Sequence, residues 1–119
     1  MIKRGFRMRK ATDFSKTYKF GKSYNATEFY IKSLKTNYSN SKFAVVVPKK
    51  ITSKAVTRNT IRRKIYEIIR NSTNNISSGY TIIITVKTDI SNLDHKSLQE
   101  KIIDGFKKSG LLVNEKNTQ

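Results

Sequence analysis

Apolar side chains recur with helical spacing in three parts of the chain. Residues 12–20 carry Phe14 and Tyr18 one turn apart, and residues 58–71 place isoleucines every three or four positions. A third repeat follows Asp94, a residue type that suits a helix N-cap. The repeated positions of the second and third segments are Ile61, Ile65, Ile68, Leu98, Ile102 and Phe106. The spacing predicts three helices, each with one face turned toward a core.

Strand patterns lie between these helices. Residues 28–35 alternate between a core side and a polar-aromatic side, which is typical of a half-buried strand. Residues 42–47 and 80–87 are mostly apolar or β-branched, and we expect residues 42–47 to form a central strand that ends at Pro48. The order helix, two or three strands, helix, strand, helix predicts a small α+β or split βαβ domain around one sheet.

The composition limits the domain organisation. The chain has 119 residues, of which 36% are hydrophobic, enough for one modest core. We expect a basic N-terminal arm over residues 1–10, one domain over residues 11–113 and a frayed tail over residues 114–119. Cysteine is absent, which excludes disulfides and thiolate metal sites. The apolar runs are far too short to span a bilayer, so we expect a soluble cytoplasmic protein with no membrane partner.

Positive charge dominates the composition. Lys and Arg number 25 against 8 Asp and Glu, a net charge of +17. Residues 1–70 hold 19 basic and 3 acidic side chains, whereas residues 71–119 hold 6 and 5. A surface charged only for solubility would not divide in this way. The charge therefore predicts a nucleic-acid partner.

The second predicted helix concentrates this charge on one side. At 100° per residue, four polar positions fall within about 60° of each other, opposite the isoleucines. These positions are Asn59, Arg63, Tyr66 and Arg70, with Arg62 beside them and Arg58 in the first turn. Guanidinium groups bind phosphate through two hydrogen bonds, and an asparagine reaches a base edge or a 2′-hydroxyl. An ordinary solvated face would mix signs, but only Glu67 offsets these cations. We expect the helix to bind folded RNA.

Short motifs occur around this helix in a specific order. They are Lys49-Lys50, Ala55-Val56, Arg58-Asn59, Arg62-Arg63 and Glu67 followed by Arg70, with Asp13-Phe14, Tyr18 and Gly21 near the N-terminus and the isoleucine-rich residues 82–86. Together they resemble the bacterial ribonuclease P protein family over roughly residues 4–112. Two positions depart from the family pattern. Thr60 replaces an arginine, and Tyr66 replaces another that is usual there, so we expect Tyr66 to stack on a base or sugar instead.

The resemblance implies a fold and a function. The implied fold is α+β in the order α-β-β-β-α-β-α, with a four-stranded mixed sheet, helices packed on it, and a left-handed βαβ crossover that is opposite to the general rule. The implied function is that of the protein subunit of ribonuclease P. Such a subunit binds the catalytic RNA and the 5′ leader of precursor tRNA, and it promotes endonucleolytic removal of the leader.

The same resemblance implies where each partner binds. The catalytic centre belongs to the RNA subunit, and the holoenzyme requires Mg²⁺, so the protein alone is expected to have no catalytic residue, no bound cofactor or metal and no small-molecule substrate. The residues expected to bind the RNA subunit are Lys49, Lys50, Lys54, Arg58, Asn59, Arg62, Arg63, Tyr66 and Arg70.

A cleft between the first helix and the sheet is implied for the leader. Its expected residues are Phe14, Tyr18, Tyr30, Lys32 and Val46. Aromatic rings with interspersed cations hold single strands without reading their sequence. The family commonly has an aromatic residue at Lys32, whereas here Tyr30 supplies it, which moves the stacking platform by about 7 Å along the strand. The alternative is that Phe14 and Tyr18 belong to the core.

The sequence does not indicate that the chain itself is a nuclease. A metal-dependent nuclease needs clustered carboxylates, but the first 66 residues contain only Asp13 and Glu28. His95 is the sole histidine and is expected at the surface. A structural RNA-binding protein, such as a ribosomal protein, remains the second hypothesis, and a free-standing nuclease is the third.

Overall fold

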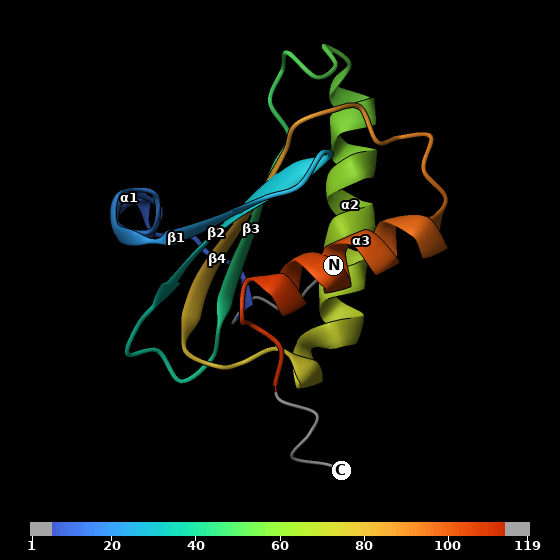
Figure 1. Ribbon diagram of the computed structural model, residues 1–119. Coiled ribbons are helices and arrows are strands. Elements are labelled where there is room, and N and C mark those ends of the chain that lie inside the picture. The colour runs from blue at the N-terminus through green and yellow to red at the C-terminus, as the bar shows by residue number, and fades with distance from the viewer. Residues whose placement is uncertain (1–5, 114–119) are drawn as a thin grey trace.

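The computed structural model describes residues 6–113 as a four-stranded sheet with helices on both faces (Figure 1). Its elements are α1 (Ala11–Phe20), β1 (Lys22–Asn25), β2 (Phe29–Lys35), β3 (Lys42–Val46), α2 (Ala55–Ser72), the 3₁₀ turn η2 (Thr73–Asn75), β4 (Tyr80–Val86) and α3 (His95–Lys108). The α+β class and the order α-β-β-β-α-β-α are confirmed. The sequence pattern did not place β1, because Tyr24 is the only apolar residue among its four.

The sheet has the order β1-β2-β4-β3 and is mixed, as expected. The pairs β1–β2 and β2–β4 are antiparallel, whereas β3 and β4 are parallel. Parallel neighbours need a crossover, and α2 supplies it on one face of the sheet. The left-handed sense of that crossover stays a prediction from the resemblance.

Strand β3 lies at an edge of the sheet, so the prediction that it is central is wrong. Its apolar run is explained by the coverage of both of its faces. Part of its outer edge is covered as well, because Arg7 forms a parallel bridge with Phe43 and the Met8 N–H donates to the Phe43 carbonyl at 2.8 Å. The predicted arm thus packs along β3 from residue 6 onward; residues 1–5 and the predicted tail over residues 114–119 lie outside the described residues.

Helices α2 and α3 cover one face of the sheet and close the main core (Figure 1). Its fully buried side chains include Phe29, Ile31, Phe43, Ile61, Ile65, Ile68, Ile82, Ile84, Leu98, Ile102 and Phe106. All six positions expected from helical spacing are therefore buried. Gly105 lets α3 approach β2 closely, since an added Cβ would lie 2.9 Å from Ile31 Cδ1. The Asp94 side chain caps α3 by accepting from the Ser97 N–H, and Gly110 follows the helix with φ +75°.

Candidate RNA-binding surfaces

Helix α2 places its arginines on the side away from the core. Asn59, Arg63 and Arg70 are exposed, while Arg58 and Arg62 are half-buried. Arg62 donates to the Asn59 side chain, which orients both groups on one surface. This part of the expected polar face is present, because the isoleucines of the opposite stripe draw the helix onto the sheet.

These cations are almost entirely uncompensated. Across residues 6–113, the single ion pair on α2 joins Arg70 to Glu67, and that contact holds the pKa of the Glu67 carboxyl below its usual value. No ion pair joins Arg58, Arg62 or Arg63 to an acid in the same range. Arg58 donates to the Thr52 carbonyl at 3.0 Å, which fixes its guanidinium beside the connection that precedes the helix.

The lysines before α2 extend the charged surface. Lys49, Lys50 and Lys54 are exposed, and the first two lie in a turn closed by the Ile51 N–H donating to the Pro48 carbonyl at 3.0 Å. The backbone from β3 into α2 therefore carries cations directly to the first turn of the helix. The free N–H groups of that turn also favour anions.

Tyr66 departs from the expected open face. It is only 4% exposed, its hydroxyl accepts from the Val45 N–H at 3.2 Å, and the Arg7 guanidinium lies 5.0 Å from the centre of its ring. The prediction that Tyr66 shares the exposed face is wrong. The angle of Tyr66 on the helix was correct, but the N-terminal arm and the edge of β3 cover that side of α2.

A second surface lies on the opposite face of the sheet, where α1 crosses (Figure 1). Tyr30 and Val46 each pair with Thr85 across neighbouring strands, so the three side chains form one row. Phe14 and Val46 are half-buried against a small cluster of Met8, Ala44 and Ile83. The helix thus brings Phe14 to the same face as Tyr30 and Val46, as expected.

Tyr18 and Lys32 complete the predicted cleft. Lys32 pairs with Ile83 and is half-buried on the same face as Tyr30, and Tyr18 is 40% exposed. The residue that fixes α1 to the sheet is Thr17, which is fully buried and whose Oγ1 lies 2.6 Å from Thr81 Oγ1. Tyr18 is therefore not a core residue, and Phe14 is shared between the cluster and the surface.

Thr85 is a residue of this face that the sequence reasoning missed. It lies between Tyr30 and Val46, and its buried Oγ1 has no hydrogen-bond partner within the described part of the chain. The alternation Thr81, Ile83, Thr85 in a strand otherwise made of buried isoleucines was the available signal. Thr85 therefore places an unpaired hydroxyl between the side chains of Tyr30 and Val46 on this face of the sheet.

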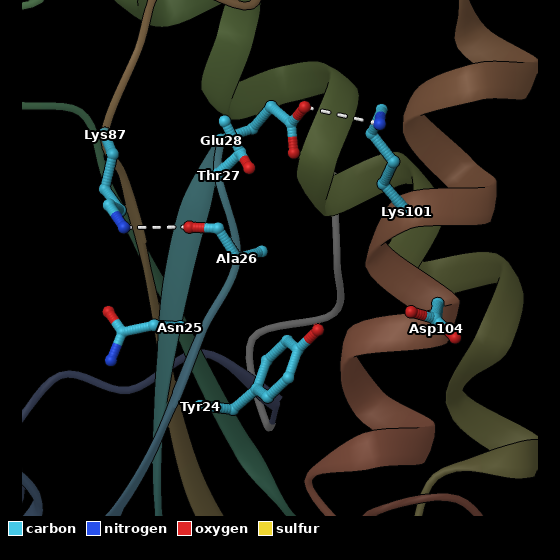
Figure 2. Close-up of a pocket in the computed structure, with 8 residues that line it drawn as sticks. All are labelled: Tyr24, Asn25, Ala26, Thr27, Glu28, Lys87, Lys101 and Asp104. Carbon is cyan, nitrogen blue, oxygen red and sulfur yellow. Dashed lines mark hydrogen bonds and ion pairs between the residues drawn. The ribbon is translucent and has the colours of Figure 1, made fainter.

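A third candidate site is a hollow of about 540 Å³ between the β1–β2 turn and α3 (Figure 2). Its lysines already have partners: Lys101 pairs with Glu28 at 3.3 Å, and Lys87 donates to the Ala26 carbonyl at 2.8 Å. Asp104 adds negative charge to its wall. This balance of signs makes the hollow a poorer site for a polyanion than the other two surfaces.

Metal-ligating groups are dispersed. No group of three His, Cys, Asp or Glu residues in positions 6–113 could hold a metal ion. His95 is exposed at the start of α3, where the sequence led us to expect it.

The fold and these surfaces define a class: a small α+β protein with one arginine-rich helix and one aromatic sheet face. The model of the family described as Ribonuclease P matches residues 2–110, and the chain therefore belongs to that family. Relatives named ribonuclease P protein component come from Pseudanabaena, with 31% identity over 89% of this chain and 92% of the relative, and from Clostridioides difficile, with 32% over 89% and 93%.

Solved structures agree with this membership. The RNase P protein from Thermotoga maritima is 28% identical, covers 86% of this chain and 96% of its own, and superposes with a TM-score of 0.78. A mutant of the Staphylococcus aureus RNase P protein shares the fold with a TM-score of 0.83 at 23% identity, over 91% of each chain. Within residues 6–113, no helix is both long and apolar enough to cross a bilayer.

Proposed function

We propose that this chain is the protein subunit of a cytoplasmic ribonuclease P holoenzyme, in which it binds the catalytic RNA through α2 and the 5′ leader of precursor tRNA through the α1 face. The observation that carries this proposal is the Arg62-Arg63 pair on the outer side of α2, with Arg58 one turn earlier and no acid paired with any of them in residues 6–113, in a chain of this family. A structural RNA-binding protein would share the charge but not this family signature.

The α2 surface acts by neutralising phosphate. Its guanidinium groups approach the backbone of a folded RNA and displace condensed counterions, so affinity for the RNA subunit falls with salt. The lysines of residues 49–54 extend the contact beyond the end of the helix. The apolar stripe of α2 holds this array rigid, because each buried isoleucine resists rotation of the helix on the sheet.

The α1 face acts by stacking and by charge. Tyr18 and Tyr30 offer rings to the bases of a single strand, and Lys32 on the same face supplies a positive charge for its phosphates. Val46 and Phe14 form an apolar floor that excludes water from the contact. Binding of this kind tolerates any leader sequence, because every base has a stacking face.

Cleavage itself belongs to the RNA subunit and its magnesium ions. The protein contributes by reducing phosphate repulsion between the two RNAs and by holding the leader, and both effects raise the effective affinity for substrate. No step of the bond cleavage is assigned to a side chain of this chain.

A reconstitution tests the proposal. The purified protein is mixed with a bacterial ribonuclease P RNA and precursor tRNA across a magnesium series. We expect cleavage at the mature 5′ end to be stimulated most at low magnesium. Absence of stimulation at every magnesium concentration, with the protein folded by circular dichroism, rejects the proposal. Robust cleavage without the RNA subunit would instead support a free-standing nuclease.

The division of labour between the two surfaces has its own test. Tyr18→Ala removes an exposed ring, so we expect the affinity for leader-bearing precursor tRNA to fall by about 1–3 kcal/mol while that for mature tRNA is unchanged. Arg58→Ala should instead weaken binding to the RNA subunit. Fluorescence titrations measure both affinities, and equal losses of the same interaction in both variants contradict the assignment.

A further inference from the structure

Helix α1 divides its face of the sheet into two sides. Thr17 points into the sheet and marks the line of contact. At 100° per residue, Phe14 and Tyr18 lie on one side of Thr17, whereas Lys16 and Phe20 lie on the other. The proposed leader surface uses only the first side, which leaves the second without a role.

Two adjoining hollows begin on this second side and continue past the end of β2 and the start of β4 to the end of α3. One, of about 430 Å³, is bounded by Asp13, Lys16, Leu34, Lys35, Thr36, Asn37 and Tyr38. The other, of about 300 Å³, is bounded by Phe20, Lys22, Ser33, Leu34, Lys35, Tyr80, Ser109 and Gly110. They share Leu34 and Lys35, so they form one depression that we call the outer groove. It runs from the β2–β3 connection, past the last turn of α1, to the end of α3.

Every aromatic ring along the outer groove has a lysine over it. The ammonium groups of Lys19, Lys35 and Lys42 lie 5.5, 5.3 and 5.3 Å from the ring centres of Phe20, Tyr80 and Tyr38 respectively. Phe20 is 65% exposed, which is unusual for a phenylalanine at the end of a packed helix. Rings and cations in alternation are the arrangement that binds the bases and phosphates of a single strand.

The charge of the outer groove is one-sided. Lys16, Lys22 and Lys35 are exposed, and no acid pairs with them within residues 6–113. The one acid in its wall, Asp13, accepts from the Tyr38 hydroxyl at 2.9 and 3.0 Å, and this hydrogen bond raises the pKa of Tyr38. These features suit a polyanion that also offers flat apolar surfaces.

We propose that the outer groove binds a second segment of single-stranded RNA, with bases stacked on Phe20 and Tyr80 and phosphates held by Lys16, Lys22 and Lys35. This site is separate from the proposed leader surface, because α1 stands between them. An apolar peptide of a partner protein fits the groove less well, since it would leave three lysines facing a neutral chain.

A stoichiometry experiment tests the proposal on the full chain. The probe is a 5′-fluorescent hexauridylate, titrated at near-physiological salt, with 4-thiouridine at one position for photo-cross-linking. We expect one bound hexamer to cross-link to the peptide that contains Tyr80. The double variant Phe20→Ala/Lys35→Ala should bind one hexamer fewer than the wild type, and its cross-links to the peptide that contains Tyr80 should disappear. Both changes are at exposed positions, so the fold should be retained, as circular dichroism checks.

Two further variants separate the sites. Tyr18→Ala should also bind one hexamer fewer than the wild type but keep the cross-link near Tyr80. Lys96→Ala, a change at an exposed lysine of α3, should bind as many hexamers as the wild type. Phe20→Ala alone should weaken the second binding event about fivefold or more with little change in its salt dependence. The proposal is overturned if the wild type gives no cross-link to the peptide that contains Tyr80, or if Phe20→Ala/Lys35→Ala binds as the wild type does. If the Phe20→Ala/Lys35→Ala variant still stimulates cleavage of a precursor tRNA with a short leader, the proposed ribonuclease P function does not depend on the outer groove.

Discussion

The two faces of the sheet are formed by the same strands, but one face is buried in the core and the other is partly open. On the face covered by α2 and α3, the side chains of β2, β4 and β3 are large, apolar and almost fully buried. On the face crossed by α1, the same strands present Tyr30, Lys32, Thr85 and Val46, and one helix covers only part of them. Strand alternation makes this separation possible, because successive residues point to opposite faces.

The difference shows where stability and binding reside. A closed isoleucine face stabilises the fold and sets the angle of α2. Of the arginines on that helix, Arg58, Arg62 and Arg63 form no ion pair within residues 6–113, whereas Arg70 pairs with Glu67. The half-open face contributes less to stability and keeps aromatic groups available. Mutations on the closed face should therefore lower stability, whereas mutations on the half-open face should mainly weaken binding. The following predictions are given from the largest expected effect to the smallest.

The largest effect should come from the closed face. Ile65→Ala leaves a cavity at a position with 0% exposure, so we expect the free energy of unfolding to fall by about 2–5 kcal/mol. Val46→Ala, on the half-open face, should cost less than about 1.5 kcal/mol because its site is partly hydrated already. Urea denaturation measures both, and comparable losses would contradict the division.

The next effect tests Tyr66 as a structural residue. Tyr66→Phe keeps the ring under Arg7 but removes the hydroxyl that accepts from the Val45 N–H. A buried N–H without an acceptor costs about 1–3 kcal/mol, which chemical denaturation should detect. Affinity for the RNA subunit, measured on protein kept folded, should not change; a loss of affinity with unchanged stability would show that Tyr66 contacts RNA.

A smaller effect is expected from a single arginine of α2. Arg63→Ala should weaken binding to the RNA subunit by about three- to tenfold and reduce the slope of log affinity against log salt by about one unit. Its stability should be unchanged because Arg63 is exposed. Lys96→Ala on α3 serves as the matched control, and an equal loss there would mean that net charge alone drives binding.

The smallest effect concerns the cap of α3. Hydrogen bonds from Ser97 to the Asp94 carboxylate hold the pKa of Asp94 below its usual value of 3.8. A lowered pKa in the folded state contributes stability above about pH 4, and this contribution is lost as the pH falls through the folded value. An asparagine also caps helices but does not titrate, so the Asp94→Asn variant should lose less stability than the wild type between about pH 5 and pH 3. Parallel pH dependence of thermal unfolding in the two proteins would contradict the assignment.

Much of this architecture could be predicted from the sequence because its elements are strongly periodic. The isoleucines of α2 and the Leu98, Ile102 and Phe106 repeat of α3 read directly as buried helix faces, and both are buried. The alternation of residues 28–35 likewise separated Phe29 and Ile31 from Tyr30 and Lys32 correctly. The arginine face of α2 followed from the same helical geometry.

The errors on β3 and Tyr66 share one physical cause, which is coverage by segments distant in sequence. β3 reads as central because its faces are buried, yet an edge position with a covering arm gives the same pattern. Tyr66 reads as exposed because no local signal places Arg7 over its ring. Strand β1 was missed because four mostly polar residues form a strand only when β2 supplies the partner.

The strand order β1-β2-β4-β3 has a consequence for how the chain folds during synthesis. β4 lies between β2 and β3, yet it leaves the ribosome last of the four, after α2 has been made. Until β4 arrives, the two earlier strands have no common neighbour, and the isoleucines of α2 have no complete sheet to cover. The native pairs of β4 with β2 and with β3 therefore cannot form until about two-thirds of the chain exists, and α3, which follows β4, completes the core only after that.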